Sequence, residues 1–444
     1  MNDVLALAFD SLNWIELKKN RASAVGRSAK LLVVKDQKTI TQAYFLVKNV
    51  LQRKNYIDRV LSLACAPSAL KDFSLSSQSF LRIFVFKAKF ESTNLTELIE
   101  LTKVSRLILG WKNLMPLEEF LGQILKIIDS NDVVSGLTDI DKISFQTFYP
   151  QWFVKYCFHL LGRCRALKLL NFNVSPNQYI KINTFKEKEE VIFKEISCPG
   201  VILQKIEAIP FLYKVICGAK LLAGLESYVN GLFSFQDFPS SLAVVFASPR
   251  PGDVIIDVGI HPVSKTIYLA QLMKNSGKIF SIDFSAHRLK MLISKVKRAN
   301  VGIVEPIIPE KIGHASSINQ ADVVLLSPPC SNTGVFWREP SLKWKTDFNR
   351  VKDLCNIQWN LINKYANYVK DGGNLVYWTS SITLEENELM LEQFLKLHPE
   401  FSFSETYPRI GTPGLRGQKE CQRLYPHLFA VDGSYFARLI KHEK

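Results

Sequence analysis

Cys330 is the side chain of this sequence best placed to act as a nucleophile. It follows the apolar stretch ADVVLLS and two prolines, which stiffen the chain and prevent a helix from starting there. A cysteine at the carboxyl end of a buried strand can attack an electrophilic carbon when its thiol is deprotonated. The competing interpretation is a small buried hydrophobic residue, the role of most free cysteines. For an isolated cysteine this second role is the commoner one, so the residues around Cys330 must decide between a nucleophile and a packing residue.

Two acidic residues end apolar stretches upstream of this cysteine. Asp257 ends DVIIDV, and the loop VGIHPVSKT then leads into a helix, whose free N–H groups favour the anionic part of a ligand. Asp283 ends KIFSID, where an acid commonly binds the ribose hydroxyls of a cofactor, although such acids also cap helices. No G-x-G-x-x-G follows the first stretch, so a dinucleotide fingerprint is absent.

The elements that would position these residues begin near residue 241. DVIIDV, KIFSID, ADVVLLS and NLVYWTS are rich in valine and isoleucine, which is typical of buried strands. Helical patterns such as SKTIYLAQLMKN and HRLKMLISKVKRAN separate them. This alternation predicts a parallel sheet with helices on both faces. Ligands of such sheets bind beyond the carboxyl ends of the strands, where Asp257, Asp283 and Cys330 would lie.

Two further regions precede the α/β part. Residues 1–140 are predicted to be helical, because AYFLVKNVLQRKNYIDRVLSLA and LEEFLGQILKIIDS repeat an apolar helical face. The polar, turn-rich stretch SNDVVSGLTDIDK predicts a linker. Residues 145–240 are mixed, with a helix predicted in WFVKYCFHLLGRCRALKLL and short strands in QYIKINTF and GVILQKI.

The charge of the chain favours a polyanionic partner, most commonly nucleic acid. Lysine and arginine number 56 against 41 acidic residues, a net charge of +15. The basic excess is marked in the first 60 residues, which include Lys18, Lys19, Arg21 and Arg27. A solvated helical face is the alternative explanation for these charges.

Composition excludes several classes of protein. The 444 residues, 47% hydrophobic and 22% charged, resemble an ordinary globular chain rather than a disordered or fibrous one. No segment approaches the ~20 apolar residues of a membrane span, and the first residues are unlike a signal peptide. Eight scattered cysteines without a CxxC pair predict neither a disulfide framework nor a metal site, and they favour a reducing, cytoplasmic location.

Several blocks resemble the Nop/Sun family of RNA cytosine-C5 methyltransferases, of the RsmB/RsmF type. PPCSNTGVFWREPSLKW is similar to the family block D-[AP]-P-C-S-G-T-G-x-x-R-R-x-P-[DE]-x-K-W, and GGNLVYWTSSITLEENELMLEQFLKLHPEF to GG-x-LVYSTCS-I-x-PEENE…FL…HPEF. GLFSFQDFPSSLAV and VDGSYFARLIK resemble the blocks that open and close its catalytic domain. The resemblance covers residues 150–444. Residues 1–140 more weakly resemble a NusB-like domain, best in QAYFLVKNVLQRKNYIDRVLS.

The resemblance implies a fold and a reaction. The fold is α/β: a Rossmann-like, S-adenosylmethionine-dependent methyltransferase domain over 241–444, a small α/β subdomain over 145–240, and an all-α NusB-like RNA-binding domain over 1–140. In the family a cysteine thiolate adds to C6 of a cytosine in RNA, and C5 takes the methyl group of S-adenosylmethionine. Loss of the C5 proton and elimination of the cysteine complete the turnover. The implied partner is rRNA or tRNA, without a membrane or a metal.

The catalytic positions depart from the family. The attacking cysteine falls on Ser380, the cytosine-holding aspartate falls on Ser327, and Cys330 matches the cysteine that helps to release the product. A serine hydroxyl is far less acidic than a thiol of pKa ~8.5 and is the poorer nucleophile. Glu385 and Glu386, which follow Ser380, are predicted to begin a helix.

The cofactor loop departs as well. The family loop D-x-C-A-A-P-G-G-K-T reads DVGIHPVSKT here, with Val263 and Ser264 in place of its two glycines. Glycine allows positive φ and a close approach to ligand, both of which valine resists. His314 stands where the family has an acid for the adenine. The implied cofactor-binding residues are Asp257, Gly259, Pro262, Val263, Ser264, Lys265, Asp283 and His314.

These departures predict an RNA-binding family member whose catalytic core is weakened or inactive. One alternative is an active methyltransferase that uses Cys330, and another is a ribosome-assembly scaffold without catalysis. The catalytic positions are Cys330, Ser380, Ser327 and Lys265. The predicted RNA contacts are Lys18, Lys19, Arg21, Arg27, Arg338 and Lys343.

Overall fold

The chain folds into two compact units in the computed structural model. The structure describes residues 2–17, 21–130, 132–174, 176–260, 262–309 and 320–443. Unit 1 is Met1–Asn171 with Glu339–Asp347, and unit 2 is Phe172–Arg338 with Phe348–Lys444. The main chain therefore passes between the units three times.

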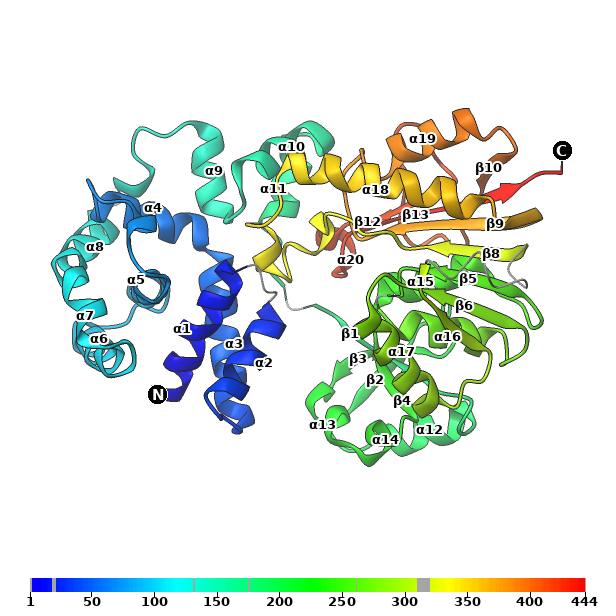
Figure 1. Cartoon of the computed structure of the whole chain (residues 1–444), viewed down its shortest axis with the longest axis horizontal. Coiled ribbons are helices and arrows are strands. Elements are labelled where there is room, and N and C mark those ends of the chain that lie inside the picture. Colours follow the sequence, from blue (N-terminus) through cyan, green and yellow to red (C-terminus); the bar gives the residue numbers. More distant parts are fainter. Residues whose placement is uncertain are drawn as a thin grey trace. The chain divides into compact units, whose positions relative to one another are not determined.

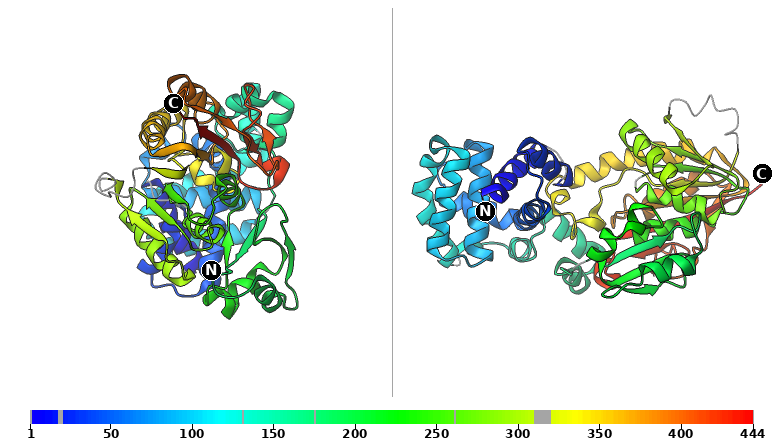
Figure 2. Two further views of the ribbon diagram at one scale, coloured as in Figure 1. Left: turned by 90° about the vertical axis from the view of Figure 1, so that its right-hand side faces the viewer. Right: turned by 90° about the horizontal axis from the view of Figure 1, so that it is seen from below.

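In the described part of unit 1 the regular elements are all helices, coloured blue to blue-green in Figures 1 and 2, with the segment Glu339–Asp347 in yellow. Side chains at several helix starts accept backbone N–H groups that a helix leaves free, as Asp36, Ser74 and Asn94 do. The elements are α1 Asn2–Glu16, α2 Arg21–Leu31, α3 Gln37–Gln52, α4 Lys54–Ala64, η1 Leu70–Asp72, α5 Leu75–Phe90, α6 Leu95–Leu109, α7 Trp111–Leu114, η2 Met115–Leu117, α8 Glu118–Ser130, η3 Asp132–Val134, α9 Asp139–Thr147, α10 Gln151–Leu161, α11 Arg163–Leu170 and η6 Pro340–Leu342. The helical prediction for the N-terminal region is confirmed.

The short segment Glu339–Asp347 is built into unit 1 by its side chains. The Trp344 indole donates to the Leu51 carbonyl (2.6 Å), and the Lys343 ammonium donates to the Phe148 carbonyl (3.1 Å). Glu339 pairs with the buried guanidinium of Arg21 at 3.0 Å. Each bond satisfies a polar group of the helices, so the fold of unit 1 depends on a segment distant in sequence.

Unit 2 contains a small antiparallel sheet of order β2-β3-β1-β4. Ile180 and Ile182 of β1 pack on α12, while Tyr179 on the other face packs against Phe238, with ring centres 5.1 Å apart. The elements of this part are β1 Gln178–Ile182, α12 Glu189–Ile196, β2 Ile202–Lys205, β3 Leu212–Cys217, α13 Ala219–Gly224, α14 Glu226–Val229 and β4 Phe233–Gln236.

The main sheet of unit 2 has nine strands, in the order β11-β12-β13-β9-β8-β5-β6-β7, with β10 beside β13. Strands β7, β6, β5, β8 and β9 run parallel, and β13 then pairs antiparallel with β9. The elements are α15 Phe238–Ala247, β5 Val254–Val258, α16 Ser264–Leu272, β6 Lys278–Ile282, α17 Ala286–Ala299, β7 Val304–Ile307, β8 Ala321–Leu326, η5 Thr333–Val335, α18 Phe348–Ala366, β9 Val369–Thr379, α19 Glu388–Leu397, β10 Phe401–Ser404, β11 Thr412–Pro413, β12 Gln422–Leu424, α20 Pro426–Phe429 and β13 Ser434–Lys441.

Helices cover both faces of this sheet, because successive residues of a strand point to opposite faces. Ile256 of β5 packs in one core with α18 and α19, and Ile255 packs in the other core with α15 and α16. Figure 1 shows the same two layers, with α18 and α19 on one side of the strands and α15, α16 and α17 on the other. The Rossmann-like α/β fold predicted for this part is confirmed.

The predicted domain boundaries differ from these compact units. Helix α9 begins within the last residues of the predicted linker, and the Asn55 side chain donates to the Ser144 carbonyl of α9 (2.8 Å), so unit 1 continues past residue 140. The predicted domains 145–240 and 241–444 share one apolar core, which joins Tyr179 to Leu242 and Ile255. Polar composition indicated a linker, but the Thr138 side chain caps a helix there instead.

One buried lysine makes the stability of unit 2 depend on pH. The Lys181 ammonium, 2% exposed, donates to the Gln271 side-chain oxygen (2.7 Å), and burial lowers its pKa to about 7. The unfolded chain holds this proton up to about pH 10.4. Between these values the unfolded state binds more protons, so stability rises with pH by up to about 1.4 kcal/mol per pH unit.

We expect Lys181→Met to raise the urea midpoint of unit 2 at pH 7 and to flatten its rise toward pH 9. The reason is that methionine fills the site without a proton to release. Urea titrations at several pH values measure the effect, and Lys220→Met, at an exposed lysine of the same unit, is the control that keeps the rise. A difference between Lys181→Met and wild type that stays constant with pH would contradict this account.

Candidate active site

The order of the main sheet places a topological switch point at the end of β5. Its parallel neighbours β6 and β8 continue in opposite directions from it, and such a point is where ligands bind in open α/β sheets. Asp257 lies in β5, Ser327 follows β8, and Ser380 follows β9. The site predicted from sequence therefore gathers at one edge of the sheet.

Lys265 lies at the centre of this edge and is fully bonded. Its ammonium donates to Asp257 Oδ1 (2.6 Å), the Gly259 carbonyl (2.9 Å) and Ser327 Oγ (2.9 Å). The side chains of Lys265 and Asp257 are both 0% exposed, and Thr266 Oγ1 donates to the second Asp257 oxygen (2.6 Å). An ammonium has three N–H bonds, and here each has an acceptor inside the protein.

Gly259 lets the loop after β5 touch the end of β8. Its φ is +77°, and a Cβ built there would lie 2.1 Å from the Ser327 carbonyl oxygen. No other residue fits, because both the backbone conformation and the space require a missing side chain. This close approach brings Ser327 within reach of Lys265.

Val263 adopts an ordinary backbone conformation in the cofactor loop. Its φ and ψ are −56° and −26°, immediately before α16, so the positive φ that valine resists is not required here. Its side chain is buried in an apolar cluster with Ile260, Leu289 and Leu292. Position 263 therefore does not need the positive φ that glycine would allow, and Ser264 starts α16.

The Asp283 carboxylate accepts hydrogen bonds from three groups of the protein. Oδ1 accepts from the Ser285 N–H (2.8 Å) and from Arg288 Nε (2.9 Å), and Oδ2 accepts from the Ile260 N–H (3.3 Å). The residue is 2% exposed. The Asp283 carboxylate thus already accepts three hydrogen bonds inside the protein, and His261 and His314 lie outside the described residues.

The structure brings Cys330 and Ser380 together. The backbone N–H groups of Ser380 and Asn332 donate toward the Cys330 sulfur, and the Gly334 N–H donates to the Ser380 carbonyl (3.0 Å). Burial, together with the nearby Glu386 carboxylate, raises the pKa of the Cys330 thiol to about 12. The half-buried Ser380 has no histidine among its hydrogen-bond partners in the described part of the chain.

Glu386 is a site residue whose position sequence reasoning missed. The prediction had Glu385 and Glu386 begin a helix, but α19 begins at Glu388 and Glu386 is fully buried before it. Its carboxylate accepts bonds from Ser331 and Ser381. The sequence signal was an acid that directly follows a hydroxyl-rich stretch, TSSIT, in which several donors can converge on it.

Two predicted RNA contacts are interior residues of unit 1. Arg21 is 3% exposed and pairs with Glu339, and Lys343 is 1% exposed. Burial and the nearby Arg53 lower the pKa of Lys343. Both side chains bond the protein's own polar groups, so the structure gives them a packing role in place of the predicted RNA contact.

The remaining predicted contacts differ in their surroundings. Arg338 is partly exposed in unit 2 and pairs with Asp432, while Arg27 is exposed in unit 1 and lies 3.8 Å from the centre of the Trp14 ring. Lys18 and Lys19 lie outside the described residues. Arg27 therefore stays a predicted RNA contact, and Arg338 has a protein partner.

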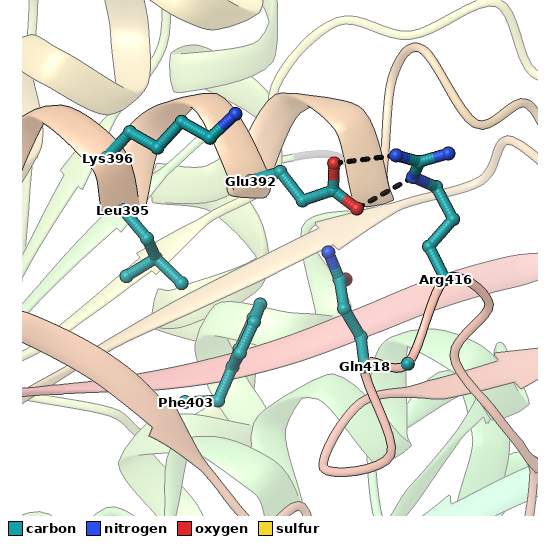
Figure 3. A pocket seen from close by; sticks show the side chains of 7 residues that line it. Glu392, Leu395, Lys396, Phe403, Arg416 and Gln418 are labelled. Carbon is teal, nitrogen blue, oxygen red and sulfur yellow. Dashed lines mark hydrogen bonds and ion pairs between the residues drawn. The ribbon is translucent and has the colours of Figure 1, made fainter.

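A surface pocket of about 430 Å³ lies away from these residues, against α19 and the loop before β12 (Figure 3). Glu392 of α19 and Arg416 form an ion pair across it at 2.7 Å. Its lining is Glu392, Leu395, Lys396, Phe403, Arg416, Gly417 and Gln418. None of the predicted site residues is among them.

The described residues contain neither a cluster suited to a metal ion nor a helix suited to crossing a membrane. No three His, Cys, Asp or Glu side chains there are grouped so that they could hold a metal ion. No helix in that part of the chain combines the length and the apolar character that a membrane crossing requires.

Solved structures similar to this chain share its fold. The crystal structure of the protein PH0851 superposes with a TM-score of 0.82 over 99% of both chains at 23% identity. The structure of NSun6 from Pyrococcus horikoshii with SFG covers 66% of this chain and 99% of that one, with a TM-score of 0.60 and 22% identity.

Sequence comparison identifies the family. The family model described as 16S rRNA methyltransferase RsmB/F matches residues 244–440. The Bacillus subtilis probable ribosomal RNA small subunit methyltransferase B is 26% identical over 412 residues, 89% of each chain. The human 28S rRNA (cytosine(4447)-C(5))-methyltransferase is 31% identical over 312 residues, but the chain spans only 38% of its length. With these matches and the motif blocks in order, the chain belongs to the Nop/Sun family.

Proposed function

We propose that this protein binds rRNA or tRNA and that its methyltransferase core is catalytically weakened or inactive. The observation that carries the proposal is the lack of an activated nucleophile among the described residues of the site. In the part of the chain that the structure describes, Ser380 has no histidine among its hydrogen-bond partners, and the pKa of the neighbouring Cys330 thiol is raised to about 12. At neutral pH neither group supplies the anion that must attack C6 of a pyrimidine.

The bonding of Lys265 supports the same proposal. In the family pattern an aspartate holds the cytosine at the position of Ser327, and here that serine accepts a bond from Lys265 instead. A hydroxyl has no charge to offer a base, and the ammonium has no N–H left for a substrate. The site thus lacks the groups that would hold the cytosine in place.

The bonding of Asp283 and Lys265 argues against binding of S-adenosylmethionine in the family manner. Asp283 is the acid expected at the ribose, and its carboxylate already accepts hydrogen bonds from Ser285, Ile260 and Arg288. The Lys265 ammonium donates all three of its N–H groups to acceptors inside the protein. We therefore derive no step through this cofactor. The alternative of an active enzyme with Cys330 as nucleophile needs both a bound cofactor and a deprotonated thiol.

RNA as the partner is supported by the net charge and by the relatives. The Bacillus subtilis relative is named for ribosomal RNA, and a Pyrococcus horikoshii relative, 32% identical over 227 residues, is named for tRNA. Exposed cations of unit 1 such as Arg27, Lys30, Lys35 and Lys38 are the proposed contacts. Lys18 and Lys19 and the NusB-like character of the N-terminal helices stay predictions.

We expect no transfer of labelled methyl groups from S-adenosylmethionine to bulk rRNA, and none after Ser380→Cys alone. The reason is that Ser380→Cys supplies a thiol but leaves Ser327 and the occupied Lys265 in place. A filter assay for tritium in RNA measures both proteins. The matched variant Ser380→Cys with Ser327→Asp tests whether the restored carboxylate is what matters. Wild-type transfer that disappears in Cys330→Ala would instead establish the active alternative.

Calorimetric titration of S-adenosylmethionine into the protein should show no binding up to about 1 mM, equivalent to roughly −4 kcal/mol. The expectation follows from the occupied carboxylate of Asp283. Binding near the micromolar range, about −8 kcal/mol, would show that the site accepts the cofactor and would contradict the proposed lack of fit.

RNA affinity should fall by about a thousandfold between roughly 50 and 200 mM salt, because phosphate contacts release counterions. Fluorescence anisotropy with an rRNA fragment measures this slope. The double variant Arg27→Gln, Lys30→Gln should reduce the slope by about 1 to 2. Lys103→Gln is the control, because that ammonium is paired with Glu100 at 2.7 Å. Absent or salt-insensitive binding would favour the scaffold without RNA.

A further inference from the structure

Helix α2 of unit 1 ends in three consecutive apolar residues that are exposed. The exposed fractions of Leu31, Leu32 and Val33 are 63%, 41% and 73%. Single apolar side chains are common on protein surfaces, but a run of exposed ones is unfavourable in water unless it serves a contact. These three residues are called the apolar turn below.

The backbone of the apolar turn would suit glycine at Val33. The Val34 N–H donates to the Ala29 carbonyl (2.9 Å) and the Val33 N–H to the Lys30 carbonyl (3.3 Å), the Schellman pattern of a helix end. The left-handed position of this pattern is commonly glycine, and here it is Val33, with a φ of +55°. A β-branched side chain is strained at this φ, so valine makes the helix end less stable than glycine would.

Val34 makes the contact that this helix end needs. Its side chain packs against an apolar cluster of Leu7, Ala29 and Ala43, as the residue after the left-handed one commonly does. Val33 is mostly exposed and contributes little to the interior of unit 1. The fold therefore gives no reason for a strained valine at position 33, which points to a contact with another molecule.

Exposed cations surround the apolar turn. From residue 21 to residue 50 the sequence has one acidic residue, Asp36. Its carboxylate accepts two backbone N–H groups at the start of α3, those of Lys38 (3.3 Å) and Thr39 (2.8 Å). The exposed basic residues on either side of the turn are Arg27, Lys30, Lys35 and Lys38. Charge complementarity therefore favours a partner that offers negative charge and apolar surface together.

Two groups suited to stacking lie on the same helices. Arg27 of α2 is exposed, and its guanidinium lies 3.8 Å from the centre of the Trp14 ring, whose indole donates to Asp10 (3.0 Å). Phe45 of α3 is 53% exposed and follows Lys38 by seven residues, which places both on one face of the helix. Aromatic rings and guanidinium planes stack on unpaired nucleic-acid bases.

We propose that the apolar turn binds unpaired bases of RNA, while the cations around it bind the phosphates. Unpaired RNA offers both chemistries, because its bases expose flat apolar faces beside a charged backbone. In a duplex these faces are stacked inside, so the turn would meet only sugars and phosphates. The inference rests on the proposed function and adds to it the class of RNA and the residues that select it.

The test is fluorescence anisotropy of the full chain with a labelled, mixed-sequence RNA of about 12 nucleotides, alone and annealed to its complement. Wild type should bind the unpaired strand about tenfold more tightly than the duplex. Val33→Gly should bind the unpaired strand about fivefold more weakly, because an apolar side chain that contacts a base is lost. The salt dependence should not change, since no phosphate contact is removed.

Stability separates this role from a structural one. The urea midpoint of unit 1 should not fall in Val33→Gly, because glycine adopts a positive φ without strain. Leu107→Ser is the matched control, since Leu107 of α6 is 81% exposed and lies outside residues 21–50, and its RNA affinity should equal that of wild type. A lower midpoint in Val33→Gly, or an equal loss of affinity in the control, overturns the inference.

Other outcomes assign the apolar turn differently. Equal affinity for the two RNAs, or wild-type affinity in Val33→Gly, overturns the inference and leaves the proposed function standing. A wild-type protein that binds neither RNA overturns the proposed function and the inference with it. Sedimentation with phosphatidylglycerol vesicles that Val33→Gly abolishes would assign the turn to a membrane surface. Self-association that the same variant abolishes would assign it to a second copy of the chain, and either result overturns the inference.

Discussion

The buried ion pair between Lys265 and Asp257 is the interaction on which the candidate site depends. Two charges without access to water are stable only when each is fully bonded, and here Gly259, Ser327 and Thr266 complete the set. One positive and one negative charge balance in this cluster. An aspartate at 327, as in the family pattern, would add a second negative charge beside the Lys265 ammonium. Ser327 has no such charge, and its hydroxyl accepts one N–H of the Lys265 ammonium, so the polar groups of this cluster bond one another.

The second buried carboxylate of the site is stabilised differently. Glu386 has hydroxyl, amide and backbone donors where Asp257 has an ammonium. Hydrogen bonds from neutral groups stabilise a charge but leave its field in place, whereas a cation nearby cancels much of it. The two buried carboxylates are thus held by different kinds of donor, an ammonium and a hydroxyl for Asp257 and hydroxyl, amide and backbone groups for Glu386.

Local patterns were enough to predict the main sheet and the place of the site. Apolar runs of valine and isoleucine predicted β5, β6, β8 and β9, and residues at their ends predicted the edge where Lys265 and Cys330 lie. The role of Lys343 was beyond such reasoning, because nothing local shows that residues 339–347 fold into the other unit. The backbone conformation of Val263 could not be predicted from the sequence either, because φ at one residue depends on the packing around it.

The distribution of retained and replaced family residues follows from these contacts. Among the retained residues, Arg338 pairs with Asp432 in unit 2, while Lys343 bonds the Phe148 carbonyl and Trp344 bonds the Leu51 carbonyl in unit 1. Losing such a side chain would leave a buried polar group unpaired, at a cost of about 1–3 kcal/mol. Ser327 and Ser380 lie where the family has chemical groups, and serine is accommodated there without such a loss. Folding alone is therefore sufficient to maintain the recognisable motifs, and it places no comparable constraint on the residues that would perform catalysis.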